Sequence, residues 1–169
     1  MATPEDQARE HIDQALEQAG WKVQDYKSAN LHAGRGVVIR NFPLVSGHGF
    51  ADYLLYIDGK AAGVIEAKKE GFPLVGVEVQ AEKYSKGLPN DLPAHFRPLP
   101  FLYQSTGVET RFTNGLDPQP RSRPVFSFHR PETLAAMIPQ HSDAPRDLHG
   151  ASLAAEATPT LRGRLRALP

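Results

Sequence analysis

The stretch of sequence that decides the fold is Ala51-Asp-Tyr-Leu-Leu-Tyr-Ile-Asp-Gly-Lys-Ala-Ala-Gly-Val-Ile-Glu-Ala-Lys68. Its two apolar runs predict β-strands over residues 51–57 and 61–69. Between them stands Asp58-Gly59, a dipeptide that is a strong short-range signal for a tight hairpin turn. We therefore expect an antiparallel pair of strands near the middle of the fold.

The sequence on either side of this hairpin predicts further helices and strands. Residues 4–19 have apolar side chains at helical spacing, with Thr3 as the N-cap, Pro4 in the first turn and Gly20 as the stop. Other extended segments are expected at 21–26, 36–40, 100–106, 109–113 and 125–129, other helices at 76–86 and 131–138, and a loop at 41–49. This order predicts an α/β fold with a mixed central β-sheet flanked by helices.

The composition indicates one ordinary globular domain followed by a tail. Hydrophobic residues make up 40% of the 169-residue chain, which is enough for a core. From Pro139 on, bulky side chains become sparse and the end is rich in arginine. We expect residues 1–138 to form the domain and residues 139–169 to form a linker or docking tail.

Several classes of protein and site are excluded. The sequence has no cysteine, which excludes disulfides, cysteine-based zinc sites and thiol nucleophiles. It has no apolar run of about 20 residues, the length that crosses a membrane. The acidic N-terminus is not typical of a secretory signal. We expect a cytoplasmic protein that does not contact a membrane.

Two carboxylates and a lysine stand at the ends of the two central strands. Asp52 begins the first strand, and Glu66 and Lys68 end the second, where residues two apart share a face. Such carboxylates are costly beside an apolar sheet unless a metal or partner compensates them. Mg²⁺ takes a few carboxylate oxygens and leaves room for water and phosphate. The pattern predicts phosphodiester hydrolysis, with Asp52 and Glu66 holding Mg²⁺ and Lys68 orienting or stabilising the nucleophile.

The register of the hairpin is a test of this prediction. With a plain two-residue turn, Asp52 would pair with Ile65, and Glu66 would lie on the other side of the sheet. A three-residue loop, or a bulge near the turn, gives other pairs: Asp52 with Glu66, Leu54 with Val64, and Tyr56 with Ala62. We predict this looser hairpin, because carboxylates on opposite faces would rule out the metal site.

The helix expected at 76–86 carries a second polar pair. Gln80 and Tyr84 are four residues apart and so share one helix face, from which they could contact DNA or support the site. An ordinary structural explanation exists for each pattern. Asp followed by Glu-x-Lys is frequent by chance, and a packed tyrosine beside a solvated glutamine is common.

In combination, these residues resemble a known family. Residues 51–68 followed by Gln80-x-x-x-Tyr84 are similar to the PD-(D/E)XK nuclease core of the restriction subunit of type I restriction enzymes. Residues 99–114 and 121–134 resemble the stretches that follow in that subunit. The resemblance extends over most of residues 5–138 and implies a restriction-endonuclease-like core.

The resemblance also implies a role for each candidate residue. Asp52 and Glu66 would be the metal ligands, Lys68 the catalytic lysine, and Gln80 and Tyr84 the accessory pair of the family. The expected activity is Mg²⁺-dependent cleavage of double-stranded DNA.

The resemblance implies partners as well. Restriction subunits of this family carry an ATP-driven translocase after the nuclease. This chain has no Gly-rich Lys-Ser/Thr phosphate loop, so we expect ATP to bind elsewhere in the full-length subunit. Its 19 basic and 19 acidic side chains cancel, whereas a self-sufficient DNA binder usually has a positive excess. We expect the helicase-like translocase domain and the methyltransferase and specificity subunits to hold and choose the DNA.

Two other functions are compatible with the same residues. The chain could be a DNA-binding or docking module that keeps the nuclease fold without activity. It could also be a stand-alone nuclease that acts on branched or damaged DNA. Glu10 and His48 could lie near the metal site, although a solvated glutamate and a histidine without function are the favoured interpretations. Arg35 and Arg40 could reach phosphates, and solvated arginines explain them at least as well.

Overall fold

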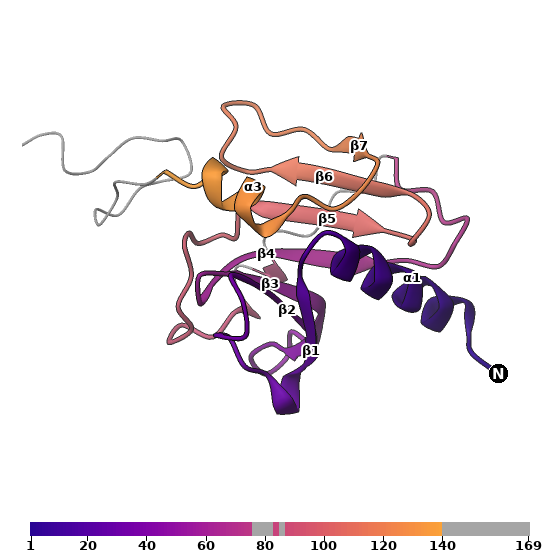
Figure 1. The fold of residues 1–169 in the computed structure, drawn as a ribbon, viewed down its shortest axis with the longest axis horizontal. Coiled ribbons are helices and arrows are strands. Elements are labelled where there is room, and N and C mark those ends of the chain that lie inside the picture. Colours follow the sequence, from indigo (N-terminus) through magenta and orange to yellow (C-terminus); the bar gives the residue numbers. More distant parts are fainter. Residues whose placement is uncertain (76–82, 85–86, 140–169) are drawn as a thin grey trace, which may run out of the picture.

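The computed structural model describes residues 1–75, 83–84 and 87–139. Within them lies a seven-stranded mixed β-sheet whose strands follow one another in chain order (Figure 1). The strands are β1 (Lys22–Asp25), β2 (Gly36–Pro43), β3 (Phe50–Ile57), β4 (Lys60–Ala67), β5 (Phe101–Ser105), β6 (Thr110–Asn114) and β7 (Arg123–Val125). The pairs β1–β2 and β4–β5 are parallel, and the other pairs are antiparallel. The predicted mixed α/β architecture is confirmed.

The helices begin and end where local signals place them. Helix α1 (Pro4–Gln18) begins with a capping box, in which the Thr3 side chain accepts from the Asp6 backbone and the Asp6 side chain from the Thr3 backbone. The chain leaves α1 through Gly20, which has a φ of 93° that glycine adopts without strain. A 3₁₀ turn, η1 (Tyr26–Ser28), and a second helix, α3 (Pro131–Met137), complete the described elements. No described helix is both long enough and apolar enough to span a membrane.

Three strands differ from the sequence prediction by more than one residue at an end. β2 continues to Pro43, into the expected loop, because Phe42 extends the pairing with β3. β4 ends at Ala67 rather than at residue 69. β7 lies earlier than predicted and ends at Val125, and Phe128 beyond it packs into the core instead of extending the sheet.

The sheet separates two apolar cores, to which alternate residues of β3 contribute. Helices α1 and α3 both pack on the first core (Figure 1). The first core comprises Ile12, Leu16, Trp21, Val38, Tyr53, Leu55, Ile57, Ala62, Ile65, Phe101, Tyr103, Phe112, Phe128, Leu134 and Ala135. The second core comprises Val37, Ile39, Phe42, Ala51, Leu54, Tyr56, Ala61, Val64, Tyr84, Leu88, Leu99 and Leu102.

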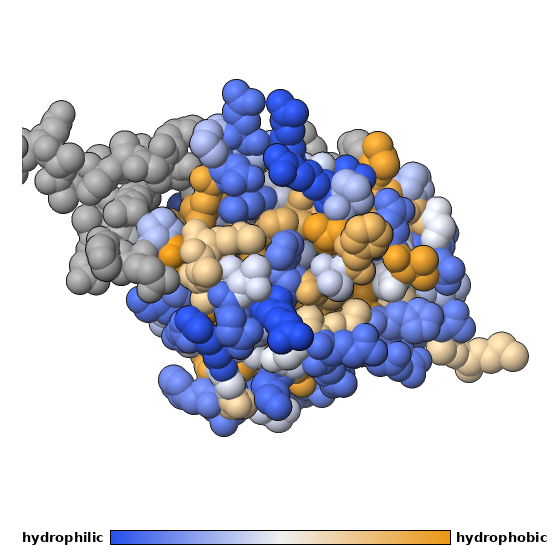
Figure 2. All heavy atoms as spheres, turned by 45° about the horizontal axis from the view of Figure 1, so that its top comes forward, coloured by the Kyte–Doolittle hydropathy of each residue, from blue (hydrophilic) through white to orange (hydrophobic). Residues whose placement is uncertain are grey.

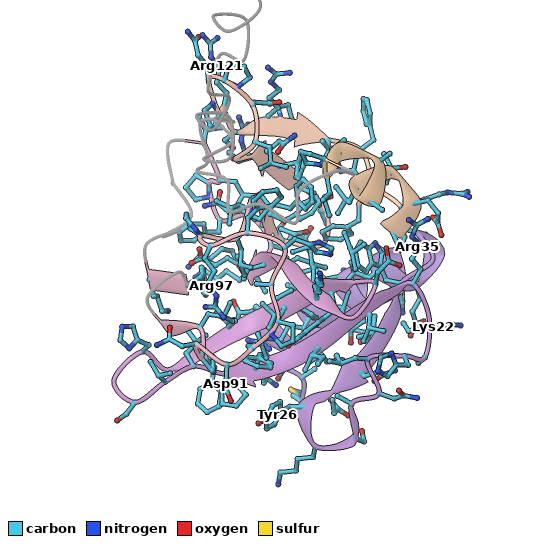
Figure 3. The ribbon with its side chains drawn as sticks, turned by 90° about the vertical axis from the view of Figure 1, so that its left-hand side faces the viewer. Lys22, Tyr26, Arg35, Asp91, Arg97 and Arg121 are labelled. Carbon is cyan, nitrogen blue, oxygen red and sulfur yellow. The ribbon has the colours of Figure 1, made fainter. Side chains whose placement is uncertain are left out.

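The segment from Leu88 to Leu99 covers the second core. Arg97, labelled in Figure 3, holds this segment by donating to the carbonyl oxygens of Pro89 and Leu92, both at 2.7 Å. The backbone N–H of Leu88 donates to the carbonyl of Tyr84, which places Tyr84 at the edge of this cover. The helix predicted at 76–86 lies mostly outside the described residues.

The β3–β4 hairpin combines a tight turn with a β-bulge. Asp58 and Gly59 have φ values of 52° and 78°, and positive φ at both central residues is typical of a type I′ turn. Next to the turn, Ile57 pairs with Lys60 and Tyr56 with Ala61. Beyond a register shift, Leu55 pairs with Gly63, Leu54 with Val64 and Tyr53 with Ile65.

Ala62 is therefore the extra residue of β4, and the bulge moves the rest of the hairpin by one position. The predicted bulge near the turn and the pair Leu54–Val64 are confirmed. The predicted pair Tyr56–Ala62 is wrong, because the turn itself has two residues and the shift comes only after Tyr56.

An aromatic cluster surrounds Tyr103 in the first core. Phe112 and Phe128 lie against its ring, with centroids at 4.7 and 5.1 Å. The Tyr103 hydroxyl lies 2.6 Å from Nδ1 of His129, and the His129 carbonyl accepts from Trp21 Nε1 at 2.8 Å. Burial lowers the pKa of His129 and so favours the neutral ring. A neutral ring can accept a hydrogen bond from the Tyr103 hydroxyl at Nδ1.

The contact between β4 and β5 requires glycine at position 63. A methyl group there would lie 2.2 Å from the carbonyl oxygen of Phe101. We expect Gly63→Ala to lower the free energy of unfolding by about 1–3 kcal/mol, because backbone must move to admit the methyl group. Urea unfolding measures this loss. Gly34→Ala, whose nearest neighbour is the flexible Lys22 side chain, is the control. Equal losses for both variants would contradict this account.

The environment of His129 makes stability depend on pH. Its pKa is lower in the folded chain than in the unfolded chain, so the unfolded chain binds the proton more readily. The stability contributed by the neutral ring is present above pH ~6.5 and is lost as the pH falls through the lower folded pKa. We expect the melting temperature to fall between pH 7.5 and 5.5, and His129→Asn to reduce that fall. His32→Asn, at an exposed position, should melt like the wild type at each pH.

Candidate functional site

The three predicted catalytic residues lie at one end of the central hairpin. Beyond the bulge, the β3–β4 pairing ends with Tyr53 and Ile65, and Asp52 and Glu66 are the next residues on the two strands. The backbone N–H of Ala67 donates to Oδ2 of Asp52 at 3.0 Å, which places this carboxylate directly beside the end of β4. The carboxylates of Asp52 and Glu66 are 26% and 20% exposed, so solvent reaches both.

Glu66 and Lys68 are paired with each other. Oε1 of Glu66 lies 2.9 Å from Nζ of Lys68, as expected for residues two apart on one face of a strand. The Lys68 ammonium also lies 5.4 Å from the centre of the Phe72 ring. The lysine, which directly follows β4, is thus oriented by a carboxylate of that strand and by the ring of Phe72.

The charges of both carboxylates influence Tyr84. Its side chain is 4% exposed and belongs to the second core. Burial raises the pKa of its hydroxyl, and the negative charges of Glu66 and Asp52 raise it further. Gln80 lies outside the described residues.

Asp52 has a partner that the sequence did not reveal. Nη2 of Arg9, on α1, lies 2.5 Å from Oδ1 of Asp52, and Nη1 of Arg9 donates to Oδ1 of Asn41 at 2.8 Å. The only signal in the sequence is position, since Arg9 stands beside the apolar stripe of the helix that carries Ile12. That signal does not identify its partner on β3.

A second polar link joins α1 to the sheet one turn further along. Asp13 accepts from the Tyr53 hydroxyl at 2.8 Å and pairs with Arg40 at 3.2 Å. Burial raises the pKa of Asp13, although the hydrogen bond from Tyr53 and the charge of Arg40 act in the opposite direction. Arg40 also lies 3.4 Å from Asp25, so its described partners are carboxylates of this chain.

The remaining candidates have described partners or positions away from the three residues. Glu10 is exposed on α1. Nδ1 of His48 lies 3.3 Å from the carbonyl oxygen of Ser46, and Arg35 pairs with Asp58 of the hairpin turn. Gln104, which sequence reasoning did not single out, is 2% exposed and is level with Glu66 on the neighbouring strand β5.

The donor set suits a hard cation held by few protein ligands. Asp52 and Glu66 offer carboxylate oxygens from two adjacent strands. Among the described residues there is no group of three or more His, Cys, Asp or Glu side chains placed to hold a metal. Mg²⁺ fits this arrangement, because it commonly uses one or two carboxylates and completes its shell with water and phosphate oxygens.

Three comparisons connect this chain with known proteins. The family model of the type I restriction enzyme EcoKI endonuclease subunit second domain matches residues 17–106, more than half of the chain. The type I restriction enzyme EcoKI endonuclease subunit of Escherichia coli (strain K12) is 26% identical in an alignment that is 182 positions long and covers 79% of this chain. The chain spans only 16% of the length of that relative.

A solved structure has the same fold. It is a fragment of a protein assigned as an HsdR subunit of a type I restriction enzyme from Vibrio vulnificus YJ016. The two chains share 20% identity and superpose with a TM-score of 0.56, over 79% of this chain and 25% of the other.

The link between Tyr53 and Asp13 is open to direct measurement. The hydroxyl of Tyr53 is directed to Asp13 and lies 3.2 Å from the Arg9 carbonyl oxygen, in a buried position. We expect Tyr53→Phe to lower the free energy of unfolding by about 1–3 kcal/mol, because it removes a hydrogen bond to a charged group. Tyr26→Phe, at a side chain that is 50% exposed, is the matched control. If chemical denaturation gives the same free energy for both variants, the polar link does not hold α1.

Proposed function

This chain belongs to the family of the type I restriction enzyme EcoKI endonuclease subunit second domain, and we propose that it supplies the DNA-cutting site of such an enzyme. The proposed reaction is Mg²⁺-dependent hydrolysis of phosphodiester bonds in double-stranded DNA. The observation that carries this proposal is the meeting of Asp52, Glu66 and Lys68 at one end of the β3–β4 hairpin. The charges of the two carboxylates raise the pKa of the Tyr84 hydroxyl, which supports a place for Tyr84 near the site.

Each residue has a distinct part in the proposed reaction. Asp52 and Glu66 would hold Mg²⁺, which lowers the pKa of a bound water and neutralises charge on the phosphate. Lys68, oriented by Glu66 and Phe72, is placed to direct the nucleophile or to stabilise the negative charge that develops. Tyr84, and Gln80 by its place in the sequence, would support the site or contact DNA.

We propose that other parts of the enzyme hold and select the DNA. The chain has no net charge, so its contribution to phosphate binding is small. The proposed partners are the helicase-like translocase domain of the same subunit, which would bind ATP, and the methyltransferase and specificity subunits. Several large apolar side chains are exposed, including Phe126 (111%) and Val75 (71%). Apolar side chains are visible among hydrophilic ones in Figure 2, and such surfaces can pack on neighbouring domains.

The proposal is tested in the complete restriction complex with Asp52→Asn and Lys68→Gln. We expect DNA cleavage to fall by about 100-fold or more, because each change removes an interaction of the reacting phosphate or its metal. ATP hydrolysis and translocation should continue, since they are assigned to another domain. Removal of Mg²⁺ cannot separate the two activities, so the variants are the decisive measurement.

Asp58→Asn and Lys60→Gln are the matched controls, because both residues lie at the opposite, turn end of the same hairpin. Unchanged cleavage in Asp52→Asn would favour a docking module without catalytic function. Parallel loss of cleavage and ATP hydrolysis would indicate that the substitution acts through folding.

A further inference from the structure

Each carboxylate of the proposed metal site has a basic partner within the chain. Glu66 pairs with Lys68, a residue of the same motif. Asp52 pairs with Arg9 of helix α1, which lies 43 residues earlier in the chain. Lys68 has a part in the proposed hydrolysis. Arg9 has no part in that reaction, although its ion pair with Asp52 is the shorter of the two, at 2.5 Å against 2.9 Å.

Arg9 is held in position by a residue with an uncommon backbone conformation. Asn41, which accepts from Nη1 of Arg9, has a φ of 49°, a left-handed value that asparagine tolerates better than most residues. At this point the β2–β3 register passes from Arg40–Tyr53 to Phe42–Ala51. Asn41 and Asp52 therefore stand at the same level of the two strands. Asn41 accepts a hydrogen bond from Nη1 of Arg9, and Asp52 accepts one from Nη2.

The two oxygens of Asp52 have different partners. Oδ2 accepts a hydrogen bond from the backbone N–H of Ala67. Ala67 is part of β4, so this bond breaks only if the strand pair opens. Oδ1 accepts from Arg9, whose side chain is 32% exposed and so borders solvent. A metal ion that uses Asp52 therefore competes with Arg9 for Oδ1. Two cations within about 4 Å also repel each other directly.

We propose that Arg9 is an exchangeable counter-ion of Asp52, which neutralises this carboxylate in the metal-free protein and is displaced when a divalent cation binds. This inference rests on the proposed metal site. It makes Arg9 a positioning residue that sets the affinity for metal and links the docking of α1 to the state of the site.

Metal binding tests the competition directly. Mn²⁺ is titrated into the 169-residue chain, and the free ion is followed by its electron paramagnetic resonance signal. We expect Arg9→Gln to bind Mn²⁺ about three- to tenfold more tightly than the wild type, because metal binding no longer breaks an ion pair. Arg9→Lys, which keeps the charge without the planar fork, should fall between the two. Arg35→Gln removes a comparable ion pair, with Asp58 at the hairpin turn, and should bind like the wild type.

Thermal unfolding measures the same coupling through its effect on the stability of the folded chain. In EDTA, Arg9→Gln should melt at a lower temperature than the wild type, because α1 loses its ion pair with β3. With saturating Mn²⁺ the difference should shrink or vanish, since the wild-type pair is already broken. A difference that is the same with and without Mn²⁺ would show that Arg9 has a structural role only.

Asp52→Asn separates the failure of this inference from the failure of the proposed function. If Asp52→Asn loses Mn²⁺ binding and Arg9→Gln binds like the wild type, the metal site stands and Arg9 is not a competitor. If Asp52→Asn binds Mn²⁺ as well as the wild type does, the metal site itself is wrong, and the role inferred for Arg9 is wrong with it.

Discussion

One extra residue in β4 is the constraint on which the candidate site depends. The type I′ turn at Asp58-Gly59 would by itself place Asp52 opposite Ile65 and leave Glu66 on the other side of the sheet. The bulge at Ala62 moves the pairing by one position, so that Tyr53 pairs with Ile65, and Asp52 and Glu66 are the next residues on the two strands. Bulges are frequent beside active sites because they re-aim side chains without removing the hairpin.

Two ion pairs within the chain neutralise the carboxylates at this end of the sheet. Placing two half-buried carboxylates beside an apolar core is unfavourable, and Arg9 and Lys68 offset that cost. The same contacts attach α1, since Arg9 and Asp13 stand one helical turn apart and bind groups on β2 and β3. The attachment of the helix and the charge state of the site are therefore parts of one polar network.

The neutral net charge is consistent with the proposal that other domains of a larger enzyme hold the DNA. A site that cuts DNA without choosing its position needs little electrostatic attraction of its own, provided that other domains hold the substrate. The related Escherichia coli subunit is several times longer, and this chain spans 16% of it. Charge cancellation and exposed apolar side chains both agree with a domain that works in contact with others.

The sequence by itself determined the elements whose causes are local. The capped start of α1, the glycine that ends it and the Asp58-Gly59 turn follow from the backbone preferences of a few adjacent residues. The contact between Glu66 and Lys68 could also be predicted, because the two residues lie two apart in the chain, although β4 itself ends at Ala67. Only the tertiary structure decided where the bulge lies, that Arg9 reaches Asp52, and that Arg40 binds Asp13 rather than facing solvent. These contacts join residues that are distant in the chain, so they depend on how the packed elements align rather than on any preference of the residues alone.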